Sequence, residues 1–288
     1  MPALRDTIPS ALFPRNLGVR IVRLKLTEDL HMLQLSSGQW SSLYNIFSFG
    51  LISMLACTVY TLVGQSRVLT KYRTALVMSS MVTFIAGYHY FRIFNSFNEA
   101  SKDGAVTIGT QQGAFNEAYR YVDWILTVPL LLAEVVAVLA LAKELSRSMM
   151  GRLVPASAAM IILGYPGEIS TSNSTKVLFG VLSTLPFIYI LYVLFVELGK
   201  SLDRQPEGVA ATIGRLRLLL IATWGVYPIS YLIPILVKSP TAAQAASLFT
   251  DRQIGYTVAD VLAKCVFGLT IFKIARLKSA AEGMADSH

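Results

Sequence analysis

Seven long apolar segments run through this 288-residue chain and restrict its fold more than any other feature. They cover residues 43–64, 74–90, 120–141, 153–167, 177–196, 218–237 and 254–272. A helix needs about 20 apolar residues to span a bilayer, with about 17–25 tolerated, and the fourth segment reaches this length with its flanks. We find no alternating pattern typical of strands. We therefore predict an all-α, seven-transmembrane-helix bundle as one domain over residues 40–278, followed by a cytoplasmic tail over 279–288.

The composition agrees with a membrane protein. Hydrophobic residues make up 54% of the chain and charged residues 15%, which is too apolar for an ordinary soluble domain. A net charge of +8 is explained by basic cytoplasmic loops, so we expect a lipid bilayer and no nucleic acid as partner. Cys57 and Cys265 lie inside apolar segments and are expected to be buried free thiols. We expect no metal site.

Residues 1–39 form a basic tail that differs from the rest of the chain. No apolar region of signal-peptide length follows its first charges, so we do not expect a cleaved secretory signal. Residues 17–35 could form a basic amphipathic helix on a membrane surface. A disordered tail and a targeting segment are equally open interpretations.

The loop charges predict the orientation. Seven spans put the two termini on opposite sides of the membrane. The loops and chain end on the side of the C-terminus hold thirteen basic residues: Arg67, Lys71, Arg73, Lys143, Arg147, Arg152, Lys200, Arg204, Arg215, Arg217, Lys273, Arg276 and Lys278. Apart from the tail, the opposite side holds four: Lys102, Lys176, Lys238 and Arg252. Because cytoplasmic loops carry the excess of Lys and Arg, we place the C-terminus in the cytoplasm and the N-terminus outside. Five basic residues in the tail weaken this inference without reversing it.

The third segment carries ionisable residues in the stretch RYVDWILTVPLLLAE, residues 120–134. Four side chains fall within about 80° on a helical wheel: Asp123, Thr127, Leu131 and Glu134. Arg120 lies one turn before Asp123, and Glu134 lies about 16 Å beyond Asp123 along the axis. Ionisable groups inside a span are costly and usually mark an ion or proton path. A soluble core helix with charges at its edges is the alternative, which the other six segments disfavour.

The seventh segment places Asp260 and Lys264 one helical turn apart, about 6 Å, on the same face. A lysine in the middle of a span is costly unless it is paired or chemically altered. One interpretation is an ion pair that locks the bundle. The other is a lysine that forms a Schiff base with an aldehyde, with Asp260 and Asp123 as counterions.

The chain resembles the microbial rhodopsins, in particular the proteorhodopsin and xanthorhodopsin branch of light-driven proton pumps. The resemblance covers roughly residues 40–278 and leaves out the tail. It is carried by the third-segment stretch together with GYHYFRI at 87–93, GYPGE at 164–168, STLPF at 183–187, WGVYPISY at 224–231 and DVLAK at 260–264.

This resemblance implies all-trans retinal bound to Lys264 as a protonated Schiff base, in a light-driven outward proton pump that is not an enzyme. Asp123 is then the primary counterion and proton acceptor, Asp260 the second counterion, and Glu134 the cytoplasmic proton donor. We expect Glu134 to hold its proton at rest, since its leucine neighbours disfavour the ionised form. The resemblance also leads us to expect a homo-oligomer.

Three further residues are assigned roles near the acceptor by the same resemblance. Arg120 stabilises the outward proton path, and Thr127 hydrogen-bonds within the counterion site. His89 is expected to hydrogen-bond to Asp123 and tune its proton affinity, although a lone histidine in a span is otherwise more often a packing residue.

The resemblance further implies a retinal pocket. Its expected lining residues are Trp124, Leu131, Met160, Gly164, Trp224, Tyr227, Pro228 and Tyr231. Leu131 occupies the position where leucine accompanies green absorption. Gly180 stands where many relatives carry a tryptophan, and it is either a helix-packing contact or a window for a carotenoid antenna.

Other functions of seven-helix proteins fit less well. A photosensory rhodopsin that signals through a partner is the main alternative, although sensors and channels of this fold usually lack the donor carboxylate. An anion pump would lack a carboxylate at Asp123, and a sodium pump would carry Asn and Gln instead of Asp123 and Glu134. The presence of both carboxylates therefore favours a proton pump.

Overall fold

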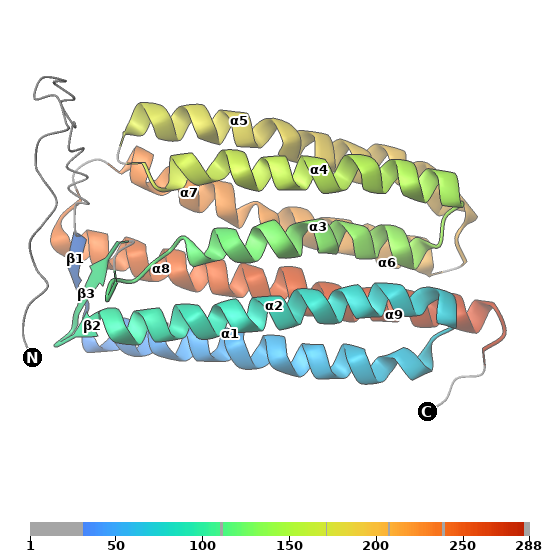
Figure 1. Ribbon diagram of the computed structural model, residues 1–288, viewed down its shortest axis with the longest axis horizontal. Helices are drawn as coiled ribbons and strands as arrows, with labels where there is room; N and C mark the ends of the chain where they lie inside the picture. The colour runs from blue at the N-terminus through green and yellow to red at the C-terminus, as the bar shows by residue number, and fades with distance from the viewer. Residues whose placement is uncertain (1–30, 110–111, 171, 207, 238–239, 285–288) are drawn as a thin grey trace, which may run out of the picture.

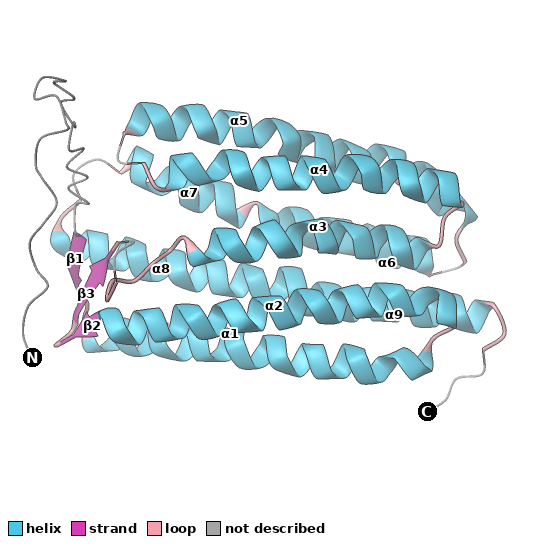
Figure 2. Ribbon diagram, in the orientation of Figure 1, coloured by secondary structure: helices cyan, strands magenta, loops and turns pink. Residues whose placement is uncertain are grey.

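The computed structural model describes residues 31–109, 112–170, 172–206, 208–237 and 240–284 (Figure 1). Most of the basic tail, and with it residues 17–30 of the possible amphipathic helix, lies outside the described residues. The remainder forms a bundle of long, nearly parallel helices capped at one end by a small sheet (Figures 1 and 2).

The described residues form seven helical rods, which confirms the predicted seven-helix bundle. The first five rods are α1 (Ser37–Val63), α2 (Thr70–Ala100), α3 (Tyr119–Leu139), α4 (Lys143–Glu168) and α5 (Asn173–Tyr192). The sixth joins α6 (Val209–Trp224) to α7 (Val226–Leu236), and the seventh joins α8 (Ala242–Asp260) to α9 (Phe267–Ala281). Several helices are longer than their apolar segments because polar turns continue them beyond the expected spans.

Short irregular helices connect or extend these rods. A 3-10 turn at Gly64–Arg67 follows α1, a π-helical turn at Val193–Glu197 extends α5, and a 3-10 helix at Gly199–Arg204 leads toward α6. A second π-helical turn, Val261–Val266, joins α8 to α9 and contains Lys264. Such π-helical turns are frequent at functional sites.

A three-stranded antiparallel sheet was not predicted. Strand β3 (Ala105–Ile108) pairs with β1 (His31–Gln34) on one side and with β2 (Ser101–Lys102) on the other. The strands are too short to show an alternating pattern. The Asp103–Gly104 turn between β2 and β3 has positive φ at both residues, a conformation typical of a tight hairpin.

The strand β1 also changes the start of the folded domain. Residues 31–34 are extended, so a helix over 17–35 is wrong for this stretch, where pairing with β3 satisfies the main chain instead. Ser36 then caps α1 by accepting a hydrogen bond from the main-chain nitrogen of Gln39. Regular structure thus begins at His31, before the predicted domain boundary at residue 40.

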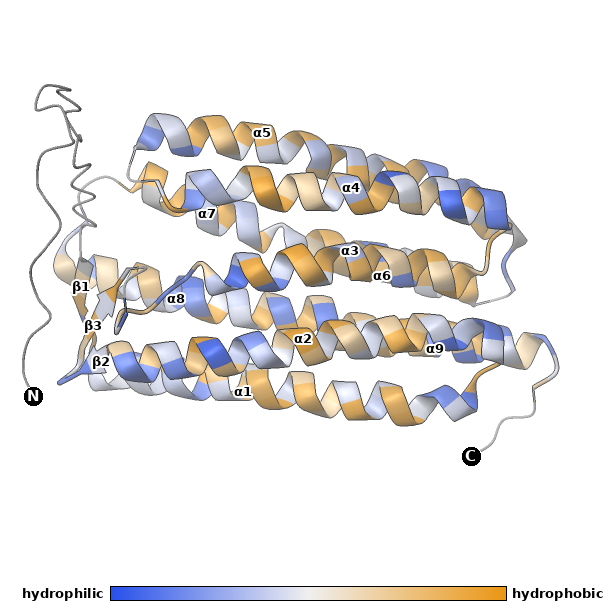
Figure 3. Cartoon of the chain, viewed as in Figure 1, coloured by the Kyte–Doolittle hydropathy of each residue, from blue (hydrophilic) through white to orange (hydrophobic). Residues whose placement is uncertain are grey.

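The surface of the bundle is suited to lipid. Five rods are long and apolar enough to cross a membrane by length and composition: those of α1, α3, α4, α5 and α6–α7. Apolar residues also lie along the other two rods (Figure 3). Large apolar side chains such as Phe84, Leu185 and Leu218 are 60–65% exposed, whereas ionisable side chains such as Asp123, Glu134 and Lys264 are buried. Apolar side chains on the surface and ionisable side chains in the interior are the distribution found in an integral membrane protein.

Candidate functional site

Lys264 lies at the centre of the bundle with its side chain 2% exposed. Its Nζ donates hydrogen bonds to Oδ2 of Asp123 at 2.8 Å and to Oδ1 of Asp260 at 2.7 Å. The π-helical turn positions the lysine, α3 positions Asp123, and the end of α8 positions Asp260. The structure therefore brings together the three charged residues that the sequence placed in one site.

Asp260 is surrounded by donors. Besides Lys264, it accepts hydrogen bonds from the hydroxyls of Tyr90 at 2.8 Å and Tyr227 at 2.7 Å, and from Nη1 of Arg120 at 3.3 Å. The indole nitrogen of Trp124 lies 3.4 Å from Oδ1. Asp260 is therefore the carboxylate with the more hydrogen-bond donors, and such donors bind an ionised carboxylate most strongly.

Asp123 has far fewer partners. Its Oδ2 accepts from Lys264, and its buried Oδ1 has no hydrogen-bond partner among the described residues. Thr127 lies one turn further along α3, but its hydroxyl donates to the main-chain oxygen of Asp123 at 2.9 Å and not to the carboxylate. Asp123 is therefore the carboxylate of the pair with an oxygen available for a proton.

The expected hydrogen bond between His89 and Asp123 is not formed in this structure. Nδ1 of His89 and Oδ1 of Asp123 are both buried without a partner. Asp123 turns its other oxygen to Lys264, and the His89 ring contacts Tyr88 edge-on with centroids 5.4 Å apart. The hydrogen bond between these two residues stays a prediction.

Arg120 links the central site to the sheet-capped end of the bundle. This 3%-exposed guanidinium contacts Asp260 and Tyr90 with Nη1 and donates to Oε1 of Gln253 at 2.9 Å with Nη2. The amide of Gln253 in turn donates to Glu117, which forms a 2.6 Å ion pair with Arg252. A continuous hydrogen-bonded chain thus runs from Asp260 to Glu117.

Sequence reasoning missed Tyr90, Gln253 and Glu117. Gln253 precedes Asp260 by seven residues, which is two helical turns, so the spacing alone places both side chains on one face of α8. No spacing within one helix indicates Tyr90 or Glu117, because their contacts depend on how α2 and the residues before α3 pack against α8.

Glu134 occupies a different environment on the same helix. It is fully buried, and the hydroxyl of Ser79 on α2 donates to its Oε2. Its Oε1 has no hydrogen-bond partner, and no ion pair to Glu134 is formed within the described part of the chain. The adjacent Leu131 and Leu132 are at most 2% exposed.

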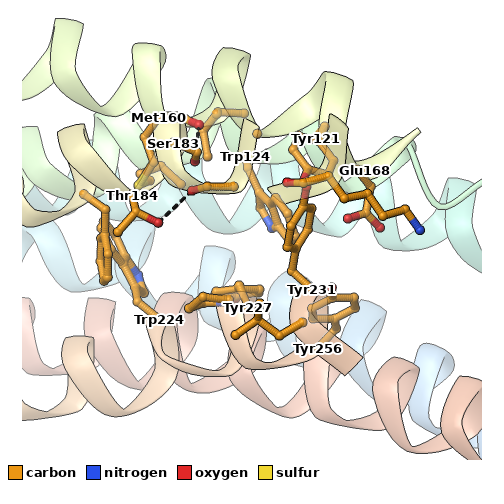
Figure 4. Close-up of a pocket in the computed structure, with 18 of the residues that line it drawn as sticks. Tyr121, Trp124, Met160, Glu168, Ser183, Thr184, Trp224, Tyr227, Tyr231 and Tyr256 are labelled. Carbon is orange, nitrogen blue, oxygen red and sulfur yellow. Dashed lines mark hydrogen bonds between the residues drawn. The ribbon is translucent and has the colours of Figure 1, made fainter. Parts of the chain in front are cut away.

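A cavity of about 300 Å³ adjoins Lys264. Its lining includes every residue expected for the pocket: Trp124, Leu131, Met160, Gly164, Gly180, Trp224, Tyr227, Pro228 and Tyr231. Figure 4 shows aromatic side chains from several helices around this space. The lining also includes Tyr121, Tyr256 and Glu168, which were not expected. A buried amine at the edge of an aromatic cavity can hold an apolar ligand by a covalent bond.

Gly180 lies on the α5 side of this cavity. A β-carbon at this position would approach Cε1 of Tyr231 to 3.0 Å, so the glycine allows close packing of the tyrosine. The neighbouring lining residues Val181 and Leu232 are 57% and 45% exposed. The cavity therefore reaches the lipid-facing surface between α5 and α7.

Comparison with known proteins identifies the family. Residues 42–277 match the family described as bacteriorhodopsin-like protein. A green-light absorbing proteorhodopsin from Gamma-proteobacterium EBAC31A08 is 30% identical over 240 residues, covering 82% of this chain and 88% of that protein. The crystallographic structure of xanthorhodopsin, described as a light-driven ion pump with dual chromophore, is 44% identical with a TM-score of 0.79, covering 89% of this chain and 100% of the other.

A crystal structure of thermophilic rhodopsin gives the same result, with 41% identity and a TM-score of 0.80 over 88% of this chain and 100% of the other. The matched region, residues 42–277, includes most of α1 and α9, the five rods between them, and the lysine, carboxylates and cavity described above. This chain belongs to the bacteriorhodopsin-like proteins and is a microbial rhodopsin.

Proposed function

We propose that this protein is a light-driven pump that moves protons outward across a membrane, with retinal attached to Lys264. The observation that carries the proposal is the amine of Lys264 between two buried carboxylates at the edge of an aromatic cavity. The relatives named as a proteorhodopsin and a light-driven ion pump support the same function.

The residues present fit retinal. Lys264 supplies a primary amine for the covalent link, and the cavity beside it is large and apolar enough for a ligand of this kind. Trp124, Trp224 and Tyr227 would hold the polyene between rings. When bound as a protonated Schiff base, retinal supplies visible absorption and a nitrogen whose proton affinity changes with isomerisation.

The two carboxylates beside Lys264 would have different roles. Asp260, held by Lys264, Arg120 and two tyrosines, stays ionised and balances charge. Asp123 has a buried oxygen without a partner, so it can take up the proton from the nitrogen at position 264. The outward exit would then follow Arg120 toward the sheet-capped end.

Glu134 would return a proton to Lys264 from the other side. It follows Asp123 by eleven residues, about 16 Å along α3, and it is fully buried beside Ser79. With the C-terminus in the cytoplasm, as the loop charges favour, Asp123 faces outward and Glu134 faces inward. A proton accepted at Asp123 and replaced from Glu134 has moved outward.

Illumination of cells or oriented vesicles, with the external pH recorded, tests this proposal. We expect acidification outside that a protonophore abolishes. A lasting light-driven flux of another ion would contradict a proton pump. A normal visible band without ion flux would instead favour a photosensory role.

We further propose that Gly180 admits the ring of a carotenoid, which would pass light energy to retinal. Three features support this: the glycine lines the cavity, the cavity reaches the surface between α5 and α7, and the xanthorhodopsin structure is described as having a dual chromophore. Tyr231, which packs on Gly180, would form one wall of this entrance.

Reconstitution with hydroxylated and keto-carotenoids tests the antenna. We expect structured blue absorption and energy transfer to retinal, and Gly180→Trp should remove both while the retinal band and pumping remain. Gly151→Trp is the matched control, because nothing lies within 4 Å of a β-carbon at Gly151. If the wild type binds none of the carotenoids in the panel, Gly180 is a packing residue.

A further inference from the structure

A second buried lysine lies at the opposite end of the bundle from the sheet. Lys278, in the last turn of α9, is 5% exposed. Its Nζ donates hydrogen bonds to the main-chain oxygen of Leu139 and, at 2.8 Å, to Oε1 of Gln205. It also lies 5.2 Å from the centre of the Tyr72 ring. Lysines are rarely buried unless they are paired, and the proposed proton path does not use this one.

The partners of Lys278 come from three other parts of the chain. Leu139 is the last residue of α3, Tyr72 lies in the first turn of α2, and Gln205 follows the 3-10 helix that leads to α6. The last carbonyls of a helix lack partners within the helix and carry partial negative charge. The ammonium of Lys278 supplies the missing donor at the end of α3.

Two neighbours of Lys278 strengthen this junction. The Ser279 hydroxyl accepts a hydrogen bond from the main-chain nitrogen of Leu69 at 2.9 Å. The Glu282 carboxylate accepts one from the Tyr72 hydroxyl and pairs with Lys71. We call Lys278, Ser279 and Glu282 the α9 clasp, because together they hold the ends of α2, α3 and the segment before α6 against α9.

The α9 clasp lies close to the proposed proton donor. Leu139 follows Glu134 by five residues, which is about 7.5 Å along the helix axis. Glu134 is fully buried, so a proton from this side reaches it only when the end of the bundle admits water. The contacts of Lys278 must loosen for such an opening, since they join the helix that carries Glu134 to its neighbours.

We infer that Lys278 is a positioning residue that keeps the cytoplasmic end of the bundle closed and thereby limits how fast Glu134 is reprotonated from the cytoplasm. This inference rests on the proposed proton-pump function. It adds a rate-setting contact that lies outside the retinal cavity and outside the carboxylate network.

The test compares Lys278→Met with Lys273→Met, a control at an exposed lysine on the same helix. Amide exchange of residues 137–143 in the dark reports opening without depending on pumping, and flash photolysis reports reprotonation of Glu134. For Lys278→Met we expect both to accelerate by about fivefold, the effect of losing roughly one hydrogen bond. Lys273→Met should match the wild type in both measurements.

Gln205→Leu provides a second variant that keeps the lysine and removes one partner. It should accelerate amide exchange and the reprotonation of Glu134, but less than Lys278→Met does. Wild-type exchange and reprotonation rates in a folded Lys278→Met or in Gln205→Leu would overturn the inference. Failure of the pump proposal is distinct, because it would appear as absent proton transport in the wild type whatever the exchange rates.

Discussion

The two carboxylates of α3 share one helix face but have opposite surroundings. Asp123 adjoins a network in which Lys264, Arg120 and Asp260 are joined by hydrogen bonds that continue to Glu117. Among the described residues, Glu134 has one hydrogen-bond partner, Ser79, and the adjacent Leu131 and Leu132 are at most 2% exposed. Helix α3 therefore sets the spacing of the two carboxylates, whereas the neighbouring helices determine what each carboxylate can do.

The physical reason lies in the cost of buried charge. An ionised group in an apolar interior is tolerated when it is paired and hydrogen-bonded, as around Lys264. Without such partners a carboxyl group is better tolerated as the neutral acid, which suits a proton donor at rest. One helix can thus carry two carboxyl groups in opposite surroundings, because the rod of α8 and α9 provides charges near Asp123 and α2 provides a hydroxyl near Glu134.

Lys264→Ala should have the largest effect, because it removes the amine that binds retinal and that pairs with Asp123 and Asp260. We expect a folded protein with no visible absorption band after retinal is supplied, measured by absorption spectroscopy of the purified protein. Lys273→Ala, at an exposed position, should keep the band. A visible band that survives in Lys264→Ala, without added free amine, would show that retinal is attached elsewhere.

Asp123→Asn should abolish pumping and shift the band to the red. The lost negative charge no longer stabilises the positive nitrogen of the ground state, and the proton loses its acceptor. The spectrum and the light-driven pH change measure the two effects. Asp251→Asn, on the exposed side of α8, should change neither. An unchanged colour in Asp123→Asn would mean that Asp260 alone acts as counterion.

Glu134→Gln should leave the resting colour nearly unchanged but slow reprotonation at Lys264 by about 100-fold or more, the usual loss for a positioned acid. Its distance from the nitrogen explains the unchanged colour, and its missing proton explains the delay. Flash photolysis at several pH values measures the rate, which should become proton-dependent. The comparison breaks down if Glu134→Gln and Asp123→Asn behave alike.

The sequence was sufficient for what depends on one helix at a time. Segment length predicted the seven rods, and helical spacing placed Asp123 with Glu134 and Asp260 with Lys264. The donors from Tyr90, Gln253 and Glu117, and the burial of Lys278, depend on how several helices pack, which spacing within one helix cannot give. The sequence predicts for Lys278 only a charge at the cytoplasmic end, because none of the residues near it in sequence indicates a contact with the carbonyl of Leu139.

The smallest expected effect concerns Ser79, the hydrogen-bond partner of Glu134. Ser79→Ala removes the hydroxyl that contacts Oε2. A hydrogen bond to an ionised carboxylate is stronger than one to the neutral acid, so the hydroxyl stabilises Glu134 after it has given up its proton. Its loss should slow proton transfer from Glu134 by about fivefold, corresponding to roughly 1 kcal/mol, with little change in colour.

Ser80→Ala is the matched control, because the adjacent hydroxyl bonds to Thr61 on α1 at 2.7 Å and not to Glu134. Flash photolysis of the two variants separates loss of the specific contact from loss of a buried hydroxyl at the α1–α2 contact. A faster transfer in Ser79→Ala would reverse the assignment, since the serine would then act by holding the proton on the resting acid. Equal rates in both variants and the wild type would leave the apolar packing around Glu134 as the feature that distinguishes it from Asp123.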